Sequence, residues 1–297
     1  MLALRYRWWM VVAAIAIVAS LAFVTCQAVA SRASVTTYAD GPGPSRLRVL
    51  FIGNSLTYVN SMPGIVAGMV RSRHPELAPR LVMVAAAGYS LEEHNANGRA
   101  AELLRENRWD VVVIQERGGY AIDHPAETRQ YAGLLAGAAR RAGAVPLLMV
   151  DWFQASSSEP PGAAITAIAT RLGVRTLPVG PALARIHHDL PDVELIVSDG
   201  QHPSRSGSYA IACIAYATIL HESPEGLPTR FDLVEPDGRE QVGGGLDAVT
   251  GRRLQADAWQ AIASSPPTDW RPQSRAGSRR QVALRTSPPR RWSGSLP

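Results

Sequence analysis

The sequence predicts an α/β fold in which a parallel sheet of about five strands lies between two layers of helices. Two observations support this prediction. Short runs of β-branched and aliphatic residues alternate along the chain with longer segments of helical spacing. The short runs are apolar throughout rather than at every second residue, which is typical of strands that are buried on both faces. We therefore expect a three-layer α/β/α sandwich.

The expected elements follow one another in a regular order. The apolar runs predict strands over 47–52, 80–84, 110–115, 144–150 and 174–179. Helical spacing predicts helices over 63–73, 91–106, 126–142, 160–172, 182–190 and 208–220. Local signals agree, because Ser90 and Glu93 form a capping box, Pro125 suits a first helical turn and Gly143 suits a helix end.

The first 30 residues have the pattern of an export segment. Arg5 and Arg7 precede the apolar stretch 8–24, and the small residues 28–30 follow it. A cleaved signal peptide and an uncleaved N-terminal membrane anchor both fit, and a lipoprotein site at Cys26 is a weaker third interpretation because Thr25 is large for that pattern. We expect the protein to be exported, to the extracellular space or the cell envelope.

The remaining chain divides into three parts by composition. Residues 31–45 contain several Gly and Pro and no apolar period, so they are expected to form a linker. The folded domain is expected over 46–264, with a last helix in the segment 246–262. Residues 265–297 are rich in Arg, Pro and Ser and are expected to be disordered.

Charge and cysteine content exclude several classes of function. The net charge is +5, but the segment 271–297 holds seven arginines and no acid, so the rest of the chain is close to neutral and no nucleic-acid partner is expected. No lysine is present, which excludes Schiff-base chemistry and a phosphate-loop lysine. Cys26 and Cys213 are the two cysteines, so neither a disulfide framework nor a thiolate metal site is expected, and Cys213 is expected to be buried.

Ser55 lies where a catalytic residue would be useful. It follows the first strand by three residues, and ligands of open α/β sheets bind beyond the carboxyl ends of the strands. A serine in such a loop is by itself more often a turn or cap residue.

A second loop supplies the groups that would activate a serine. Asp199 and His202 lie three residues apart just before the helix expected from residue 208. A serine hydroxyl needs a base to take its proton, and a carboxylate orients that base and stabilises its charged form. Asp199 or His202 alone would be interpreted as an ordinary surface residue. Together with Ser55, they predict a nucleophile, a base and an orienting acid.

These two stretches resemble the SGNH hydrolases, also called GDSL-like esterases, and in particular their DUF4886-like branch. The first block of that family resembles 51–57, with Asn54 where many members have aspartate, and the last block resembles 199–203. The resemblance covers about 47–222. It implies a flavodoxin-like sandwich with Ser55 as nucleophile, His202 as general base and Asp199 as orienting acid.

The same resemblance implies an oxyanion hole made of the Ser55 amide, the Gly88 amide and a side chain after the third strand. The family commonly has Gly-x-Asn-Asp at that last place, whereas this chain has Gln115 followed by Glu116. Gln115 keeps an amide donor on a side chain one methylene longer, so the donor geometry and the size of the substrate that fits are expected to differ from those of the family.

Three further residues are candidates for a substrate pocket. Asn54 precedes the nucleophile, while Asp151 and Trp152 follow the fourth strand and border the same edge of the sheet. Asp151 is also a second candidate for the orienting acid. A structural role is the more ordinary interpretation of both Asp151 and Trp152. His187 and His188 are interpreted as a solvated pair, and residues 92–94 as an exposed helix start.

The sequence therefore predicts an exported serine esterase that cleaves acetyl or short acyl esters from a carbohydrate or a similar polar acceptor. No metal, organic cofactor or obligate protein partner is expected. Two alternatives stay open from the sequence. The same site could transfer the acyl group to a glycan instead of to water, or the domain could be an inactive glycan-binding module, an interpretation that the departure at Gln115 favours.

Overall fold

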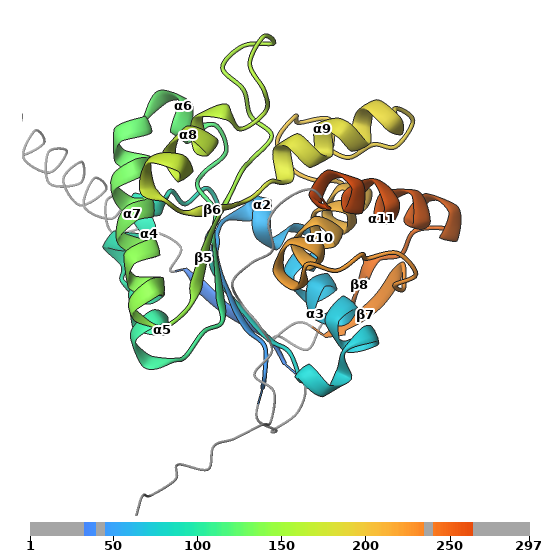
Figure 1. Ribbon diagram of the computed structural model, residues 1–297, viewed down its shortest axis with the longest axis horizontal. Helices are drawn as coiled ribbons and strands as arrows, with labels where there is room; N and C mark the ends of the chain where they lie inside the picture. Colours follow the sequence, from blue (N-terminus) through green and yellow to red (C-terminus); the bar gives the residue numbers. More distant parts are fainter. Residues whose placement is uncertain (1–32, 40–44, 235–239, 264–297) are drawn as a thin grey trace, which may run out of the picture.

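A computed structural model describes residues 33–39, 45–234 and 240–263. Its central sheet has six strands in the order β1-β3-β2-β4-β5-β6 (Figure 1). Five of them are parallel and confirm the expected sheet: β2 (Arg48–Gly53), β3 (Arg80–Ala85), β4 (Val111–Ile114), β5 (Val145–Met149) and β6 (Arg175–Leu177). The order of the parallel strands is that of a flavodoxin-like fold.

The sixth strand corrects one expectation. Ser34–Ala39 form β1, which pairs antiparallel with β3 at the edge of the sheet, although 31–45 were expected to be a linker. Thr36 and Tyr38 are buried while Thr37 between them is exposed, so this part of the segment alternates as a half-buried edge strand does. The expected export segment at 1–30 and the expected disordered tail at 265–297 lie outside the described residues.

The helices form a layer on each face of the sheet (Figure 1). One layer contains α4 (Leu91–Asn97), α5 (Arg99–Glu106), α7 (Pro125–Arg141) and α8 (Ala163–Leu172). The other contains α3 (Met62–Arg73), α9 (Val179–Asp189), α10 (Arg205–Leu220) and α11 (Ala248–Ile262). The single helix expected over 91–106 is divided at Gly98, whose φ of 76° ends α4.

The apolar runs of the strands fill two separate cores. In β2, Val49 and Phe51 pack under one helix layer, and Leu50 and Ile52 pack under the other. This explains why the strand is apolar at every position. Cys213 is buried in α10, as expected.

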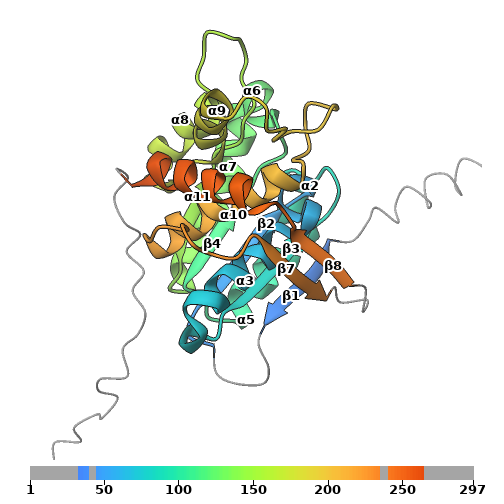
Figure 2. The ribbon, with the colours of Figure 1, turned by 90° about the vertical axis from the view of Figure 1, so that its right-hand side faces the viewer.

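Shorter elements complete the described chain. They are α2 (Ser55–Tyr58), η1 (Val59–Ser61), η2 (Pro75–Leu77) and α6 (Tyr120–Asp123). A hairpin of β7 (Arg230–Val234) and β8 (Glu240–Gly244) packs beside α3, as Figure 2 shows. In the described part of the chain, no helix is long and apolar enough to cross a membrane.

Candidate active site

The turn after β2 presents Ser55 at the carboxyl edge of the sheet. Ser55 is the first residue of α2, and Asn54 caps this short helix by accepting a hydrogen bond from the Leu56 N–H at 3.0 Å. β2 has β3 on one side and β4 on the other, so Ser55 lies at the position where the strand order reverses. Crevices at such positions are the usual ligand sites of this fold class.

Ser55, His202 and Asp199 form a continuous hydrogen-bonded chain. The Oγ atom of Ser55 lies 2.9 Å from Nε2 of His202, and Nδ1 of His202 lies 2.7 Å from Oδ2 of Asp199. A proton on Nδ1 satisfies the carboxylate and leaves Nε2 as an acceptor for the serine hydroxyl. The structure therefore brings together the three residues that the sequence singled out.

Asp199 is held as an anion. The hydrogen bond from the His202 ring, and then the N–H groups of His202 and Gln201, lower the pKa of this exposed carboxyl to about 2. Its second oxygen, Oδ1, accepts both backbone bonds, at 2.9 Å and 2.7 Å. One short loop thus supplies both the acid and the contacts that orient it.

The loop that carries His202 is fixed at both of its ends. The Val197 N–H donates to the His202 carbonyl at 2.9 Å, and Ser204 caps α10 by accepting from the Gly207 N–H. A Cβ atom at Gly207 would lie 1.9 Å from the Leu195 carbonyl oxygen, so only glycine allows this close approach.

Asn60 joins the serine segment to the histidine loop, and sequence reasoning missed it. Its Nδ2 donates to the Pro203 carbonyl at 3.2 Å and to the Ser208 hydroxyl at 3.0 Å. Asn60 has a φ of 54°, a left-handed conformation that asparagine tolerates better than most side chains. The signal available in the sequence was an asparagine in the short polar stretch after Ser55.

Gln115 does not occupy the place expected of an oxyanion donor. Its side chain is buried, and its Oε1 accepts from the Asn54 N–H at 2.9 Å and from the Thr57 hydroxyl at 3.0 Å. Its Nε2 donates to the Glu116 carbonyl. The amide group is therefore turned into the protein, where it braces the turn that carries Ser55.

Two backbone N–H groups remain as candidate oxyanion donors. Ser55 begins α2, so its N–H has no acceptor within that helix. Gly88 is exposed, and its φ of 67° is one that favours glycine. Gly88 belongs to the loop that follows β3, next to the loop that follows β2.

Asp151 lies at the end of β5 and takes no part in the chain of hydrogen bonds from Ser55. Burial raises the pKa of Asp151 to about 6, against the lowering effect of hydrogen bonds from the N–H groups of Gly119 and Phe153. The bond from Gly119 ties the loop after β4 to the loop after β5, and the bond from Phe153 orients the carboxyl within its own loop. Asp151 thus holds two loops together at this edge of the sheet.

Trp152 and Phe153, the two aromatic residues after β5, pack against different parts of the protein. Trp152 and Phe153 stack with their ring centroids 5.9 Å apart. A Cβ atom at Gly118 would lie 2.5 Å from the Phe153 ring and 3.1 Å from Leu56, so Phe153 packs beside α2. Trp152 lines a separate cavity of about 420 Å³ against Leu183 and other residues of the α9 region.

Glu116 and His94 are buried polar residues that the sequence did not identify as such. Burial raises the pKa of Glu116, which accepts hydrogen bonds from the N–H groups of Leu91 and Arg117 and from the Thr128 hydroxyl. His94 is buried rather than exposed, which corrects the interpretation of 92–94 as an exposed helix start. Its ring donates to the carbonyl of Gly53, next to the candidate nucleophile turn.

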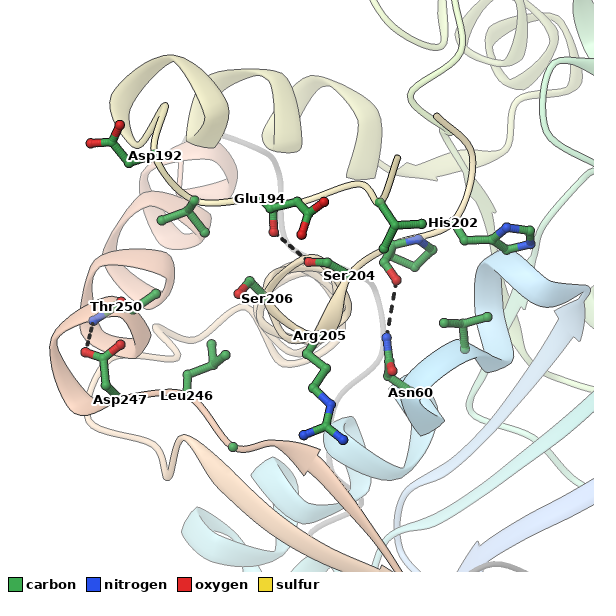
Figure 3. Close-up of a pocket in the computed structure, with 15 residues that line it drawn as sticks. Asn60, Asp192, Glu194, His202, Ser204, Arg205, Ser206, Leu246, Asp247 and Thr250 are labelled. Atoms are coloured by element: carbon green, nitrogen blue, oxygen red, sulfur yellow. Dashed lines mark hydrogen bonds between the residues drawn. The ribbon is translucent and has the colours of Figure 1, made fainter. Parts of the chain in front are cut away.

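A groove of about 770 Å³, lined by both polar and apolar residues, lies beside His202 at the start of α10 (Figure 3). Asp192 and Glu194 line it from the segment before α10, Asp247 from the start of α11, and Asn60 from η1. Within the described ranges, no cluster of three or more His, Cys, Asp or Glu residues could hold a metal ion. The described groups suit proton transfer and nucleophilic attack at Ser55.

No family model matches the sequence, and no curated protein matches it. Among solved structures, a DUF4886 family protein from Bacteroides uniformis superposes with a TM-score of 0.51 at 17% identity, over 75% of this chain and 97% of that one. The two chains share a fold. The expected resemblance to the DUF4886-like branch is thereby confirmed at the level of the fold.

Two other structures resemble this chain more loosely. A candidate SGNH hydrolase from Slackia heliotrinireducens has a TM-score of 0.47 at 25% identity, over 58% of this chain and 98% of that one. A catalytic mutant of Axe2, an acetylxylan esterase from Geobacillus stearothermophilus, has a TM-score of 0.46 at 19% identity, over 61% of this chain and 95% of that one.

Proposed function

We propose that this chain is a serine ester hydrolase of the SGNH type. The observation that carries the proposal is the hydrogen-bonded chain from Ser55 through His202 to Asp199. Three residues of the right chemical types, from two distant segments, meet in the order and geometry that nucleophilic acyl transfer requires. A purely structural role leaves this coincidence unexplained.

In the proposed reaction, the Ser55 Oγ atom attacks the ester carbonyl while His202 Nε2 takes the hydroxyl proton. The negative charge that develops on the carbonyl oxygen is stabilised by the N–H groups of Ser55 and Gly88. The bond to the alcohol then breaks, and His202 returns the proton to the leaving alkoxide. Water, deprotonated by His202, next attacks the acyl-serine; the bond between the acyl carbon and Ser55 Oγ breaks, His202 returns the proton to Oγ, and the carboxylic acid is released.

Asp199 supports both steps by orienting the imidazole and stabilising its charged form. Its pKa of about 2 keeps it ionised wherever the enzyme would work. Gln115 has no direct role in this mechanism, because its amide braces the serine turn instead. With one side-chain donor fewer than the resemblance implied, we expect a modest turnover number, since one oxyanion donor is typically worth about 3 to 4 kcal/mol.

The substrate that we propose carries an acetyl or short acyl group on a carbohydrate or a similar polar alcohol. The support is the groove that His202 also lines, where the carboxylates of Asp192, Glu194 and Asp247 offer hydrogen-bond acceptors (Figure 3). Carboxylate groups are suited to orienting a substrate that is rich in hydroxyl groups.

We also propose that the protein acts outside the cytoplasm. The support is the sequence pattern of residues 1–30 alone. N-terminal sequencing of the mature protein would distinguish a cleaved signal peptide from a retained anchor, and an intact N-terminus in a cytoplasmic fraction would contradict the proposal.

The experiment that tests the proposed activity compares p-nitrophenyl acetate hydrolysis by the wild type and by Ser55→Ala. We expect hydrolysis by the wild type and its loss in Ser55→Ala, with the same melting temperature. Ser156→Ala is the matched control, because its hydroxyl is exposed and contacts the Ser158 hydroxyl in a loop after β5. Equal hydrolysis by the wild type and Ser55→Ala would remove Ser55 from the mechanism.

A further inference from the structure

The turn that carries Ser55 is surrounded by buried polar side chains. Four of them come from three separate segments and each is only 1% exposed: Asn54, Thr57, His94 and Gln115. Buried polar groups are costly unless they are hydrogen-bonded, and such clusters are therefore placed where they specify a geometry. His94 is the titratable member of this cluster, and the mechanism proposed above does not use it.

His94 lies on α4 and holds the end of β2. Its Nε2 atom is 2.7 Å from the carbonyl oxygen of Gly53, two residues before the nucleophile. A carbonyl oxygen only accepts, so Nε2 carries the hydrogen and donates it. Burial lowers the pKa of His94, which favours the neutral form of the ring.

The other ring nitrogen of His94 indicates that the residue is not a plain core residue. Nδ1 is buried and has no hydrogen-bond partner among the described residues. An apolar side chain at this position would avoid that cost. The imidazole therefore supplies something that a leucine or phenylalanine would not, and the bond to the Gly53 carbonyl is its one assigned hydrogen bond.

Contacts through Tyr89 extend this bond to the loop that contains Gly88. The Tyr89 ring packs edge-on against the His94 ring, with centroids 5.2 Å apart and planes at 71°. The Tyr89 carbonyl accepts a hydrogen bond from Asn54 Nδ2 at 2.8 Å. Gly53, Asn54, Tyr89 and His94 thus form a closed ring of contacts between the serine turn and the residue that follows Gly88.

We propose that His94 is a positioning residue that sets the place of Ser55 relative to Gly88. Its hydrogen bond fixes the backbone immediately before the nucleophile, and its contact with Tyr89 fixes the loop of the second oxyanion donor. This inference rests on the proposed esterase function. It adds that the spacing of the two donor N–H groups depends on a histidine that touches neither substrate nor reacting atoms.

The test uses His94→Phe and His94→Gln with p-nitrophenyl acetate. Phenylalanine fills the space without a donor, whereas the glutamine amide can donate to the Gly53 carbonyl. We expect His94→Phe to lower kcat by ~10- to 100-fold with KM changed by less than about twofold, as misplaced reacting groups do. We expect His94→Gln to recover kcat to within about fivefold of the wild type, because the donor is restored.

Gln255→Leu is the matched control for lost stability. Gln255 is fully buried and hydrogen-bonds to Gly226, Tyr209 and Leu227, in the layer away from α4. We expect it to lower the melting temperature while keeping kcat, with all variants assayed well below their melting temperatures. If His94→Phe does not fold, His94→Asn replaces it, because its shorter amide does not reach Gly53 and the same loss of kcat is expected.

The outcomes separate this inference from the proposed function. Hydrolysis that survives in Ser55→Ala would overturn the proposed function, and the inference with it. Hydrolysis that requires Ser55 but is unchanged in folded His94→Phe or His94→Asn would overturn the inference alone. A kcat loss in His94→Gln as large as that in His94→Phe would also overturn it, because the restored donor would then have no effect.

Discussion

The Oγ atom of Ser55 lies 2.9 Å from Nε2 of His202, although 147 positions separate the two residues in the chain. Ser55 reaches this point from the end of a central strand, and His202 reaches it from the loop before α10. Neither side chain needs the other for burial or capping. The contact is therefore best understood through the proton transfer that it permits.

Replacing Asp199 by asparagine should reduce turnover strongly. The asparagine amide cannot match the carboxylate as an acceptor for Nδ1–H, so the ring loses the tautomer that presents a bare Nε2 to Ser55. We expect kcat to fall by ~10²- to 10⁴-fold with little change in melting temperature, because the residue is exposed. Steady-state kinetics of the wild type and Asp199→Asn across the pH range would check this prediction. An unchanged kcat in the variant would contradict it.

Asn60→Gly should weaken the link between the serine segment and the histidine loop. Glycine adopts the φ of 54° without strain, so the change removes the two side-chain hydrogen bonds and little else. We expect kcat/KM to fall by ~10-fold, because two lost hydrogen bonds of about 1 kcal/mol each loosen the Ser55–His202 alignment. Asn97→Gly, an exposed residue at the end of α4, is the control.

Gln115→Leu should act chiefly on stability. It leaves the Asn54 N–H and the Thr57 hydroxyl without their acceptor in a buried site, which costs about 1 to 3 kcal/mol for each group left unpaired. In a Thr57→Val background the cost should shrink by about 1 kcal/mol, since one of the two donors is then absent. Urea unfolding of the four proteins measures this coupling, and strictly additive effects would argue against the bracing role.

Asp151 should make stability depend on pH. Burial raises its pKa from 3.8 to about 6, so between these values the folded protein holds a proton that the unfolded chain has released. Its contribution to stability is therefore fully present below pH 3.8 and is lost as the pH rises through 6. A pKa change of this size corresponds to at most about 3 kcal/mol.

Thermal unfolding of the wild type and Asp151→Asn at pH 4.5 and pH 7.5 tests this dependence. Asparagine does not ionise, so the melting temperature of the variant relative to the wild type should be higher at pH 7.5 than at pH 4.5. Comparing the two proteins at each pH cancels groups that titrate in both, including buried Glu116. An equal difference at both pH values would be inconsistent with the raised pKa.

Much of the fold could be predicted because buried parallel strands have a simple sequence pattern. Each of the five parallel strands is an apolar run, Ser55 follows the first of them, and Asp199 and His202 lie in the polar loop before the helix α10. β1 escaped prediction because this edge strand is only half-buried and is directly followed by the Gly- and Pro-rich segment 40–45. The β7–β8 hairpin escaped for the same reason, as exposed and buried residues alternate in β7.

Within the site, residue identity was easier to predict than the orientation of side chains. Gln115 was placed correctly after β4, but its two neighbours Asn54 and Thr57 turn its amide inward, and no one-dimensional pattern contains that information. His94 was missed because Glu92 and Glu93 beside it are exposed, whereas its own position on α4 faces the sheet. Such assignments depend on contacts between segments that are distant in sequence.

The most direct test of the central claim is labelling by a fluorophosphonate probe, which reacts with an activated serine, followed by peptide mass spectrometry. We expect the folded wild type to be modified at Ser55, Ser55→Ala to be unmodified, and His202→Ala to react far more slowly. A folded wild type that is not labelled, or is labelled at another serine, would contradict the account.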